Sequence, residues 1–224
     1  MPVDARELSD LRREYAVGGL DEGDLEPDPV GMFRRWMHDS VRAGLHEPNA
    51  FVLSTVGPDG TPASRIVLLK GLDERGFVFF TNYESRKGRE LAVNPRCALL
   101  FPWHQLERQV RVEGTATRLT EAENDAYFAT RPRGSQVGAW ASSQSEVVPS
   151  RAVLDAAYDR LLTRFGQGRV PRPEHWGGYC VAPDLVEFWQ GRLGRMHDRL
   201  RYRREQGTTS DGAGAVWVTE RLAP

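Results

Sequence analysis

The stretch from residue 51 to residue 82 decides the fold: FVLSTV (51–56), GPDGTP (57–62), SRIVLLKGL (64–72), DERG (73–76) and FVFFTN (77–82). Its β-branched and aromatic runs are separated by Gly, Pro and Asp, which is typical of antiparallel hairpins. Two more strands follow at CALLFPW (97–103) and RQVRVEGTATRL (108–119). Five strands with such short connections exclude a βαβ sheet, so the sequence predicts a closed or partly closed antiparallel barrel.

Helices flank these strands on both sides. Asp28 and Pro29 are an N-cap and first-turn pair, and they open an amphipathic helix over residues 28–45. A short helix begins at Ser85 and ends before Pro95, and a capping box of Thr120 and Glu123 opens another. The helix after Asp28 has a predicted apolar face of Met32, Phe33, Trp36 and Val41. A later helix, capped by Ser150, has a predicted apolar face of Leu154, Tyr158, Leu161, Leu162 and Phe165.

Three further strands are predicted near the end of the chain, in GGYCVAPDLVEFWQG (177–191), RLRYRRE (199–205) and AVWVTERLAP (215–224). The fold class is therefore α+β and mainly β. We expect one domain over residues 28–224, preceded by an N-terminal segment over residues 1–27.

Composition excludes several classes of protein. Hydrophobic residues make up 40% and charged residues 27%, and the net charge of −1 provides no global attraction for nucleic acid or an anionic membrane. No apolar run approaches the roughly 18 residues of a membrane span. Cys97 and Cys180 lack metal-ligand spacing, and two free thiols are favoured over one disulfide. We expect a cytoplasmic protein without a metal site, a nucleic-acid partner or a membrane.

Familiar catalytic motifs are missing from the sequence. It has no GxGxxG after a strand, no Walker loop, no HExxH and no GxSxG. Dehydrogenase, NTPase, zincin and α/β-hydrolase functions therefore lose their usual sequence support.

Cationic side chains gather instead near predicted strand ends. Of 30 basic residues only Lys70 and Lys87 are lysines, and both lie in segments suited to anions, although two residues can fall there by chance. Arg65 and Lys70 lie on opposite faces of one predicted strand. Ser85, Arg86 and Lys87 begin a helix, where free N–H groups favour a phosphate. Alone this start indicates a solvated helix end; beside Arg65 it indicates a phosphate site.

A second cluster lies in RMHDRLRYRR (195–204). If the segment is extended, Arg195, His197 and Arg199 share one strand face, which is repulsive unless an anion or an electron-rich ring covers it. The alternative is a solvated basic edge strand. Trp189 beside a polar turn favours a site, because an aromatic side chain can form the wall of a cofactor pocket.

The third cluster lies in YFATRPRGSQVGAWASSQS (127–145). Tyr127, Arg131 and Ser135 provide the hydroxyl and guanidinium groups that a phosphate monoester requires. The alternative is ordinary helix-surface and turn polarity. For Gln144 alone that alternative is favoured.

Taken together, these segments closely resemble the pyridoxamine 5′-phosphate oxidase family. The matching stretches extend nearly end to end in the family's order, and the combination of WQG, R-x-HDR and the terminal RLAP is highly specific. They are LRREY (11–15), SRIVLLK (64–70), FFTNYESRKGRE (79–90), LLFPWHQLERQVRVEG (99–114), YFATRPRGSQVGAWASSQS (127–145), WGGYCVAP (176–183), EFWQGR (187–192), RMHDRLRYRR (195–204) and ERLAP (220–224).

The resemblance implies an FMN-binding split β-barrel, antiparallel and Greek-key-like, that works as a homodimer with FMN at the subunit interface. It also implies the residues around each ligand. The cofactor residues are Arg65, Ile66, Val67, Leu68, Leu69, Lys70, Phe80, Thr81, Arg86, Lys87, Gln109, Gln144, Ser145, Trp189 and Arg199. The substrate residues are Arg12, Arg13, Glu14, Tyr15, Lys70, Tyr127, Arg131, Ser135, Arg195, Met196 and His197. Among these, Arg195 and His197 would be catalytic, and residues 1–27 would close as a lid.

The implied reaction converts pyridoxamine or pyridoxine 5′-phosphate to pyridoxal 5′-phosphate with O2, releasing H2O2, and NH3 from the amine. Two alternatives stay open: another split-barrel flavin oxidoreductase, such as a phenazine-type oxidase or a flavin reductase, and a non-catalytic module that binds FMN or pyridoxal phosphate. Two positions depart from the family pattern. Met196 replaces a leucine of similar volume, and Cys180 stands where arginine is usual.

Overall fold

The computed structural model describes residues 14–15, 18–205 and 215–224. Within them the strands are β1 (Ala50–Val56), β2 (Pro62–Leu68), β3 (Gly71–Asp73), β4 (Gly76–Asn82), β5 (Arg96–Trp103), β6 (Arg108–Arg118), β7 (Trp176–Gln190), β8 (Asp198–Arg204) and β9 (Trp217–Arg221). The α-helices are α2 (Pro29–Arg42), α3 (Arg86–Val93), α4 (Glu121–Thr130), α5 (Arg133–Ala141) and α6 (Arg151–Phe165). None of these helices has the length and apolarity to cross a membrane.

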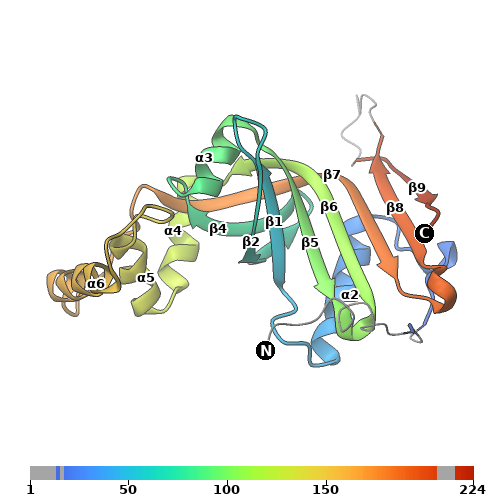
Figure 1. Cartoon of the computed structure of the whole chain (residues 1–224), viewed down its shortest axis with the longest axis horizontal. Helices are drawn as coiled ribbons and strands as arrows, with labels where there is room; N and C mark the ends of the chain where they lie inside the picture. Colours follow the sequence, from blue (N-terminus) through green and yellow to red (C-terminus); the bar gives the residue numbers. More distant parts are fainter. Residues whose placement is uncertain (1–13, 16–17, 206–214) are drawn as a thin grey trace, which may run out of the picture. The chain divides into compact units, whose positions relative to one another are not determined.

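The strands form one sheet in the order β2-β1-β5-β6-β7-β4-β3, and β8 pairs with β7 and with β9 (Figure 1). The strand pairs β1–β2, β3–β4, β4–β7, β7–β8 and β8–β9 are antiparallel. The prediction of a mainly β, antiparallel α+β fold is therefore confirmed. Neighbouring strands such as β1 and β5 are not consecutive in the chain, so the sheet contains crossovers.

The hairpin predicted at residues 51–72 forms, but its second strand ends early. Val56 pairs with Pro62 across the turn, where the Asp59 carboxylate accepts from the N–H and hydroxyl of Thr61. The predicted strand 64–72 divides into β2 and β3, because the Lys70 N–H donates to the Val78 carbonyl and redirects the chain. Lys70 consequently lies between strands and not within one.

Contacts divide the chain into two compact units, which we describe separately. The first comprises the described residues up to Pro48 together with those of Leu100–Val112 and Leu185–Pro224. The second comprises Asn49–Leu99 and Glu113–Asp184. Strands β5, β6 and β7 each contribute residues to both units.

The core of the first unit is aromatic. Phe33 contacts Phe101 edge-on at 4.7 Å between ring centroids, and Trp36 contacts Phe188 at 5.2 Å. Asp28 caps α2 by accepting from the N–H groups of Val30 and Gly31, as predicted. The predicted apolar face was wrong at Val41, which is 59% exposed. Ser40 is buried in its place, because its hydroxyl donates to the Trp36 carbonyl and is thereby satisfied.

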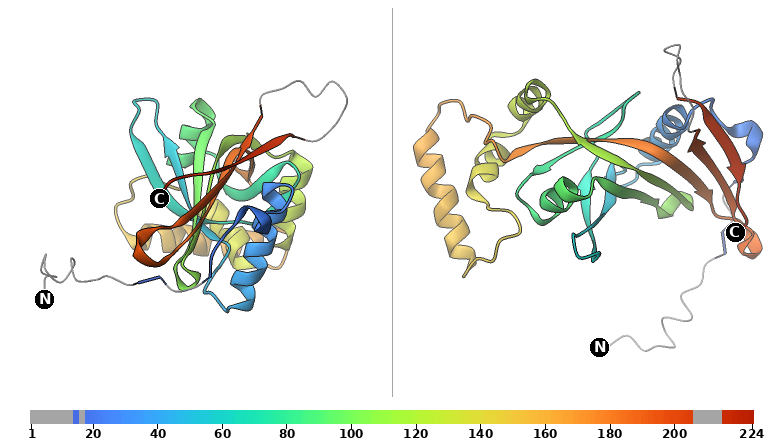
Figure 2. Two further views of the ribbon diagram at one scale, coloured as in Figure 1. Left: turned by 90° about the vertical axis from the view of Figure 1, so that its right-hand side faces the viewer. Right: turned by 90° about the horizontal axis from the view of Figure 1, so that it is seen from above.

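In the second unit α4, α5 and α6 pack around Phe128, Val137, Val170 and Trp176 (Figure 1). The capping box of Thr120 and Glu123 forms as predicted, whereas α5 was not predicted as a helix. Helix α6 lies beside α5 in Figure 1 and Figure 2. Its predicted stripe is only half-buried, and Leu162 is exposed.

Both cysteines are free and buried, as expected. Burial raises the pKa of Cys97 to about 12 and also raises that of Cys180, so both are unreactive thiols.

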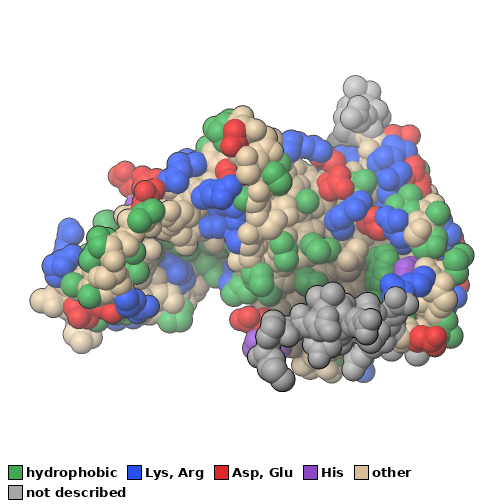
Figure 3. Space-filling model, in the orientation of Figure 1, with side chains coloured by type: hydrophobic (Ala, Val, Ile, Leu, Met, Phe, Trp, Pro, Cys, Tyr) green, Lys and Arg blue, Asp and Glu red, His purple; other side chains and the backbone are tan. Residues whose placement is uncertain are grey.

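Over the face drawn in Figure 3, basic and acidic side chains are interspersed. Exposed ion pairs also occur, such as that of Arg89 with Glu146 at 3.0 Å.

The segment carrying Arg195 and His197 does not form the predicted strand. Residues Leu193–Arg195 make a short 3-10 turn, and β8 begins only at Asp198. Arg195 has φ 63°, in the left-handed region. The alternation expected for Arg195, His197 and Arg199 therefore fails, since only Arg199 lies on a strand.

Gly76 offers a direct test of the β3–β4 hairpin. It has φ 138°, and an added Cβ would lie 2.0 Å from the Val181 carbonyl oxygen, so Gly76→Ala combines backbone strain with a clash against backbone. We expect the free energy of unfolding in urea to fall by about 2 to 4 kcal/mol. Gly60→Ala is the matched control, because Gly60 has φ 81° with open space around it. Its cost should be about 1 kcal/mol, and equal costs for the two variants would contradict the packing described.

Candidate functional site

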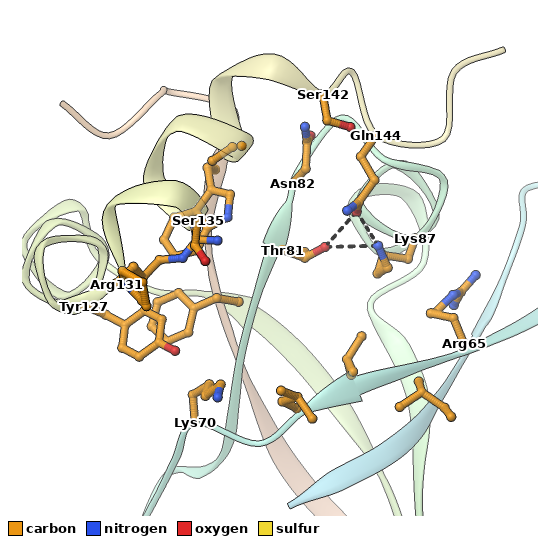
Figure 4. A pocket seen from close by; sticks show the side chains of 18 of the residues that line it. Arg65, Lys70, Thr81, Asn82, Lys87, Tyr127, Arg131, Ser135, Ser142 and Gln144 are labelled. Atoms are coloured by element: carbon orange, nitrogen blue, oxygen red, sulfur yellow. Dashed lines mark hydrogen bonds between the residues drawn. The ribbon is translucent and has the colours of Figure 1, made fainter. Parts of the chain in front are cut away.

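A cavity of about 650 Å³ opens in the second unit, a volume typical of small-molecule sites. Figure 4 shows it between β2 and β4 on one side and the helical segment that contains α4 and α5 on the other. It is lined by Arg65, Ile66, Val67, Leu68, Lys70, Phe80, Thr81, Asn82, Lys87, Tyr127, Thr130, Arg131, Pro132, Ser135, Gly138, Ala139, Ser142, Gln144 and Trp176. Twelve of these residues belong to the predicted cofactor and substrate sets.

Lys87 dominates one end of the cavity. Its ammonium donates to the Gln144 side-chain oxygen at 2.6 Å, to the Thr81 hydroxyl at 3.1 Å and to the Ser85 hydroxyl at 3.2 Å. Ser85 caps α3 through the Gly88 N–H, and this cap places Lys87 in the first turn. The arrangement brings Gln144 into the site, although sequence reasoning on that residue alone favoured ordinary surface polarity.

The charge of Lys87 has no carboxylate partner within ion-pair distance among the described residues, since its three hydrogen bonds go to neutral groups. The side chain is buried. Burial, and then the charge of Arg65, lowers the pKa of Lys87 to about 8, against a smaller opposing effect of Glu90. A buried cation in this state is stabilised by any anion that enters the cavity.

Two arginines beside Lys87 are held by one buried carboxylate. Glu90 pairs with Arg65 at 3.2 Å and with Arg86 at 2.8 Å, and it also accepts a hydrogen bond from Thr55. Burial alone would raise the pKa of Glu90, but these hydrogen bonds and the two arginine charges lower it. Sequence reasoning did not assign Glu90 a role, although its i,i+4 spacing from Arg86 was a visible signal.

Ser145, in the loop after α5, lies beside the end of the cavity that contains Lys87. Its hydroxyl accepts from the Arg86 N–H at 3.1 Å, at the start of α3, and the residue has φ 76°. The predicted residues Arg86 and Ser145 therefore adjoin Lys87 and Gln144 without lining the cavity themselves.

The other end of the cavity contains Arg131, Tyr127 and Ser135, with Lys70 nearby (Figure 4). Atom Nη1 of Arg131 is buried and has no hydrogen-bond partner within the described residues. Burial lowers the pKa of Arg131 and raises that of Tyr127. The guanidinium lies over the ring of Trp176, 4.5 Å from its centroid. Trp176 is a second residue that sequence reasoning did not assign to the site.

These two ends fit phosphate groups. Each contains a cation without an acidic partner among the described residues: the buried ammonium of Lys87, and the half-buried guanidinium of Arg131, whose buried Nη1 has no hydrogen-bond partner there. Phosphate oxygens accept charge-assisted hydrogen bonds from both kinds of group. The lining also contains apolar side chains, such as Val67, Leu68 and Phe80, which suit an aromatic ring.

A different group of predicted residues lies in the first unit. The His197 ring is 4.7 Å from Trp189 and 5.4 Å from Tyr15, measured between centroids. The Arg192 main-chain N–H donates to His197 Nδ1 at 3.2 Å, so the neutral ring carries its proton on Nε2. Burial, and then the charge of Arg195, lowers the pKa of His197.

Arg199 is fixed from two directions in the same unit. Its Nε donates to Glu187 at 2.7 Å, and Nη1 donates to the Ala223 carbonyl at 2.9 Å. Glu187 is 1% exposed and also pairs with Arg111 at 3.0 Å. The terminal RLAP sequence thus has a structural role, because its backbone holds an arginine side chain in place.

The remaining predicted residues are placed as follows. Arg195 and Met196 are exposed in the turn before β8, and Gln109 is half-buried on β6. Leu69 adjoins the cavity residues in sequence without lining the cavity, and Glu14 is exposed. Arg12 and Arg13 lie outside the described residues.

Comparison with known proteins gives consistent matches along the chain. Residues 37–165 match the family model of pyridoxamine 5′-phosphate oxidase. Residues 176–224 match that of the pyridoxine 5′-phosphate oxidase C-terminal dimerisation region, which indicates a homodimer.

Curated relatives match over nearly their whole length. A pyridoxine/pyridoxamine 5′-phosphate oxidase of a Nocardioides species is 62% identical, with 97% of this chain and 98% of the relative covered. One from Rubrobacter xylanophilus is 58% identical, with 100% of both covered.

Solved structures agree with the fold and the family. PhzG from Burkholderia lata 383, in complex with tetrahydrophenazine-1-carboxylic acid, has a TM-score of 0.84 at 32% identity over 93% of this chain and 99% of that one. An FMN-binding protein from Nostoc punctiforme, at 17% identity and TM-score 0.67 over 90% of this chain and 99% of that one, shows the fold alone. The predicted split-barrel class is confirmed. By both family models and these full-length relatives, the chain belongs to the pyridoxine/pyridoxamine 5′-phosphate oxidase family.

Proposed function

We propose that the protein oxidises pyridoxamine 5′-phosphate or pyridoxine 5′-phosphate to pyridoxal 5′-phosphate, using FMN and O2, as a cytoplasmic homodimer. O2 is reduced to H2O2, and the amine substrate also takes up water and releases NH3. The observation that supports this function is the cavity with two cationic ends. A flavin mononucleotide and a phosphorylated vitamer each present one phosphate and one aromatic ring, which is what this lining can bind.

FMN fits the end that contains Lys87. Arg65, Lys87, Thr81 and Gln144 would hold its phosphate, with Arg86 and Ser145 beside them. When bound, FMN supplies the redox chemistry, as a two-electron acceptor that O2 reoxidises. The chain contributes position and electrostatics. Glu90 cancels one of the three charges of Arg65, Arg86 and Lys87, and the remaining two match a phosphate dianion.

The substrate phosphate fits the end that contains Arg131, Tyr127 and Ser135, with Lys70 nearby. Anchoring one end of a small substrate removes most of its freedom and orients its reacting carbon. His197 contributes as a hydrogen-bond donor, because its Nδ1 accepts from the Arg192 main-chain N–H and leaves Nε2–H to face an acceptor. Its lowered pKa keeps the ring neutral near pH 7. A role as obligatory base is not required.

Pairing of two copies is part of this proposal. We infer that FMN binds where the copies meet, so that cavity residues and the group of Arg195, His197 and Arg199 act on the same ligands. The dimerisation region at residues 176–224 supports this, since it contains that group. We also propose that residues 28–224 form one functional domain and that residues 1–27 close over the site. The contact of Tyr15 with the rings of Trp189 and His197 supports the closure.

A phenazine-type oxidase is the second candidate, because PhzG shares the fold at a TM-score of 0.84. Arg131 favours the first candidate, since its buried Nη1, which has no hydrogen-bond partner among the described residues, is explained by a phosphorylated substrate. The curated relatives named as pyridoxine/pyridoxamine 5′-phosphate oxidases are also closer in sequence, at 62% and 58%.

Purified protein provides the test. We expect a flavin absorption spectrum and one H2O2 for each pyridoxal 5′-phosphate formed when either phosphorylated vitamer is added. Binding of FMN without peroxide release would favour a non-catalytic module. Turnover of tetrahydrophenazine-1-carboxylic acid, with none of the vitamers, would favour the second candidate.

Lys87→Met should separate ligand binding from stability. Because the ammonium is buried without an acidic partner, its loss should raise the free energy of unfolding of FMN-free protein by about 1 to 2 kcal/mol. Affinity for FMN should fall about 10- to 100-fold, the value of one hydrogen bond to a charged group. Lys70→Met is the control for stability, because Lys70 is exposed and its loss should leave the unfolding free energy unchanged. Lower stability of Lys87→Met without FMN would contradict the assignment.

The pH dependence of FMN affinity should follow Lys87. Its folded pKa of about 8 lies below the ordinary value of 10.5, so unfolded chains bind more protons between these values. The stability of FMN-free protein should therefore rise with pH over that window. The affinity for FMN should instead fall as pH rises above 8, because the FMN phosphate requires the charged ammonium of Lys87. Flavin fluorescence titrations from pH 7 to 9.5 measure this, and the slope should vanish in Lys87→Met.

Arg195→Ala should reduce turnover, or the affinity for substrate, about 100-fold or more while the yellow FMN complex stays intact. The reason is that Arg195 is exposed in a left-handed turn, an uncommon backbone conformation for a residue other than glycine, and the proposal places its side chain against the ligands. Steady-state kinetics and the flavin spectrum check both parts. Arg203→Ala, which removes an exposed ion pair with Glu220, should leave turnover unchanged. Wild-type turnover in Arg195→Ala would exclude Arg195 from the mechanism.

A further inference from the structure

Arg131 is held in an unusual way for a half-buried arginine whose Nη1 atom is fully buried. It has no acidic partner among the described residues, and its Nη1 has no hydrogen-bond partner there. A carboxylate beside it would neutralise its charge and occupy its donors, leaving little for a phosphate. Some other attraction must therefore keep the guanidinium at the cavity.

Two aromatic faces provide that attraction. The guanidinium carbon of Arg131 lies 4.5 Å from the ring centroid of Trp176 and 5.5 Å from that of Phe128. A ring face attracts a cation through its quadrupole and accepts no conventional hydrogen bond from the guanidinium edge. The donors of Arg131 thus stay available to a ligand.

Trp176 is itself fixed by neighbouring rings. Its plane is within 9° of the Phe80 ring at 5.3 Å and within 2° of the Tyr127 ring at 6.2 Å. The Phe80 and Tyr127 rings stack on one another at 3.8 Å. Trp176 also pairs with Asn82 at the start of β7, is 6% exposed, and lines the cavity. Its position therefore depends on the sheet and not on a mobile loop.

We propose that Trp176 is a positioning residue for substrate phosphate: its indole face holds Arg131 in place without consuming the charge or the N–H donors that bind the ligand. This inference rests on the proposed function, which assigns Arg131 to the substrate phosphate. The proposed role differs from simple packing, in which Trp176 would only fill the core beside Phe128 and Val137.

The test compares Trp176→Leu, which keeps an apolar side chain of smaller volume but loses the ring face, with Trp176→Phe, which keeps a smaller face. Trp176→Leu should raise the Kd of pyridoxal 5′-phosphate, and KM for the phosphorylated amine, roughly 5- to 30-fold. The value of kcat and the flavin spectrum should change less than about twofold. Trp176→Phe should recover most of the affinity, and pyridoxal without phosphate should bind equally to all three proteins.

A double-mutant cycle with Arg131→Met separates positioning from packing. In that background Trp176→Leu should change the Kd of pyridoxal 5′-phosphate less than about twofold, because there is no guanidinium left to hold. Trp140→Leu is the matched control. Trp140 is a half-buried tryptophan of the same unit that contacts Phe165 and His175, and it should leave the Kd unchanged.

Three results would overturn the inference. The first two are an unchanged Kd in Trp176→Leu with a wild-type melting temperature, and the same increase of Kd in the Arg131→Met background. Equal weakening of pyridoxal and its phosphate would likewise indicate simple packing. Equilibrium binding does not require turnover. Wild-type protein that binds pyridoxal 5′-phosphate but oxidises no vitamer would therefore contradict the proposed function, while the coupling of Trp176 and Arg131 could still be measured.

Discussion

The site depends on one electrostatic constraint: a cation that is to bind a phosphate inside the protein cannot already be neutralised by a carboxylate. Lys87 and Arg131 meet this constraint at the two ends of the cavity, through hydroxyl and amide oxygens in one case and aromatic faces in the other. Both solutions keep the charge in place at the expense of stability in the free protein, and the lowered pKa values of both groups reflect this.

Buried carboxylates pair instead with other arginines of the predicted ligand sets and their neighbours. Glu90 joins Arg65 and Arg86, and Glu187 joins Arg199 and Arg111. A buried carboxylate between two arginines fixes both side chains and still leaves a net positive charge. The same device thus appears in each of the two units, next to residues of the predicted ligand sets.

Much of the fold could be predicted from the sequence because its signals are local. Hairpin turns, the Asp28 cap and the capping box at Thr120 depend on neighbouring residues, and each forms as expected. The errors arose where tertiary contacts decide. The Lys70 N–H bond to Val78 divides one predicted strand, and the turn at Arg195 replaces another. For the site, residue types near phosphate motifs were recognisable. Trp176 and Glu90 were missed because their roles depend on side chains distant in sequence or on burial.

The most direct test of the central claim compares the binding of FMN and riboflavin to protein freed of flavin, at one pH and ionic strength. The two ligands share the ring system and differ in the phosphate. If uncompensated cations determine recognition, riboflavin should bind at least about 100-fold more weakly, as expected for the loss of two charge-assisted hydrogen bonds. Affinities within a factor of three would contradict the account, because they would assign the binding energy to the ring and leave the buried cations without a role.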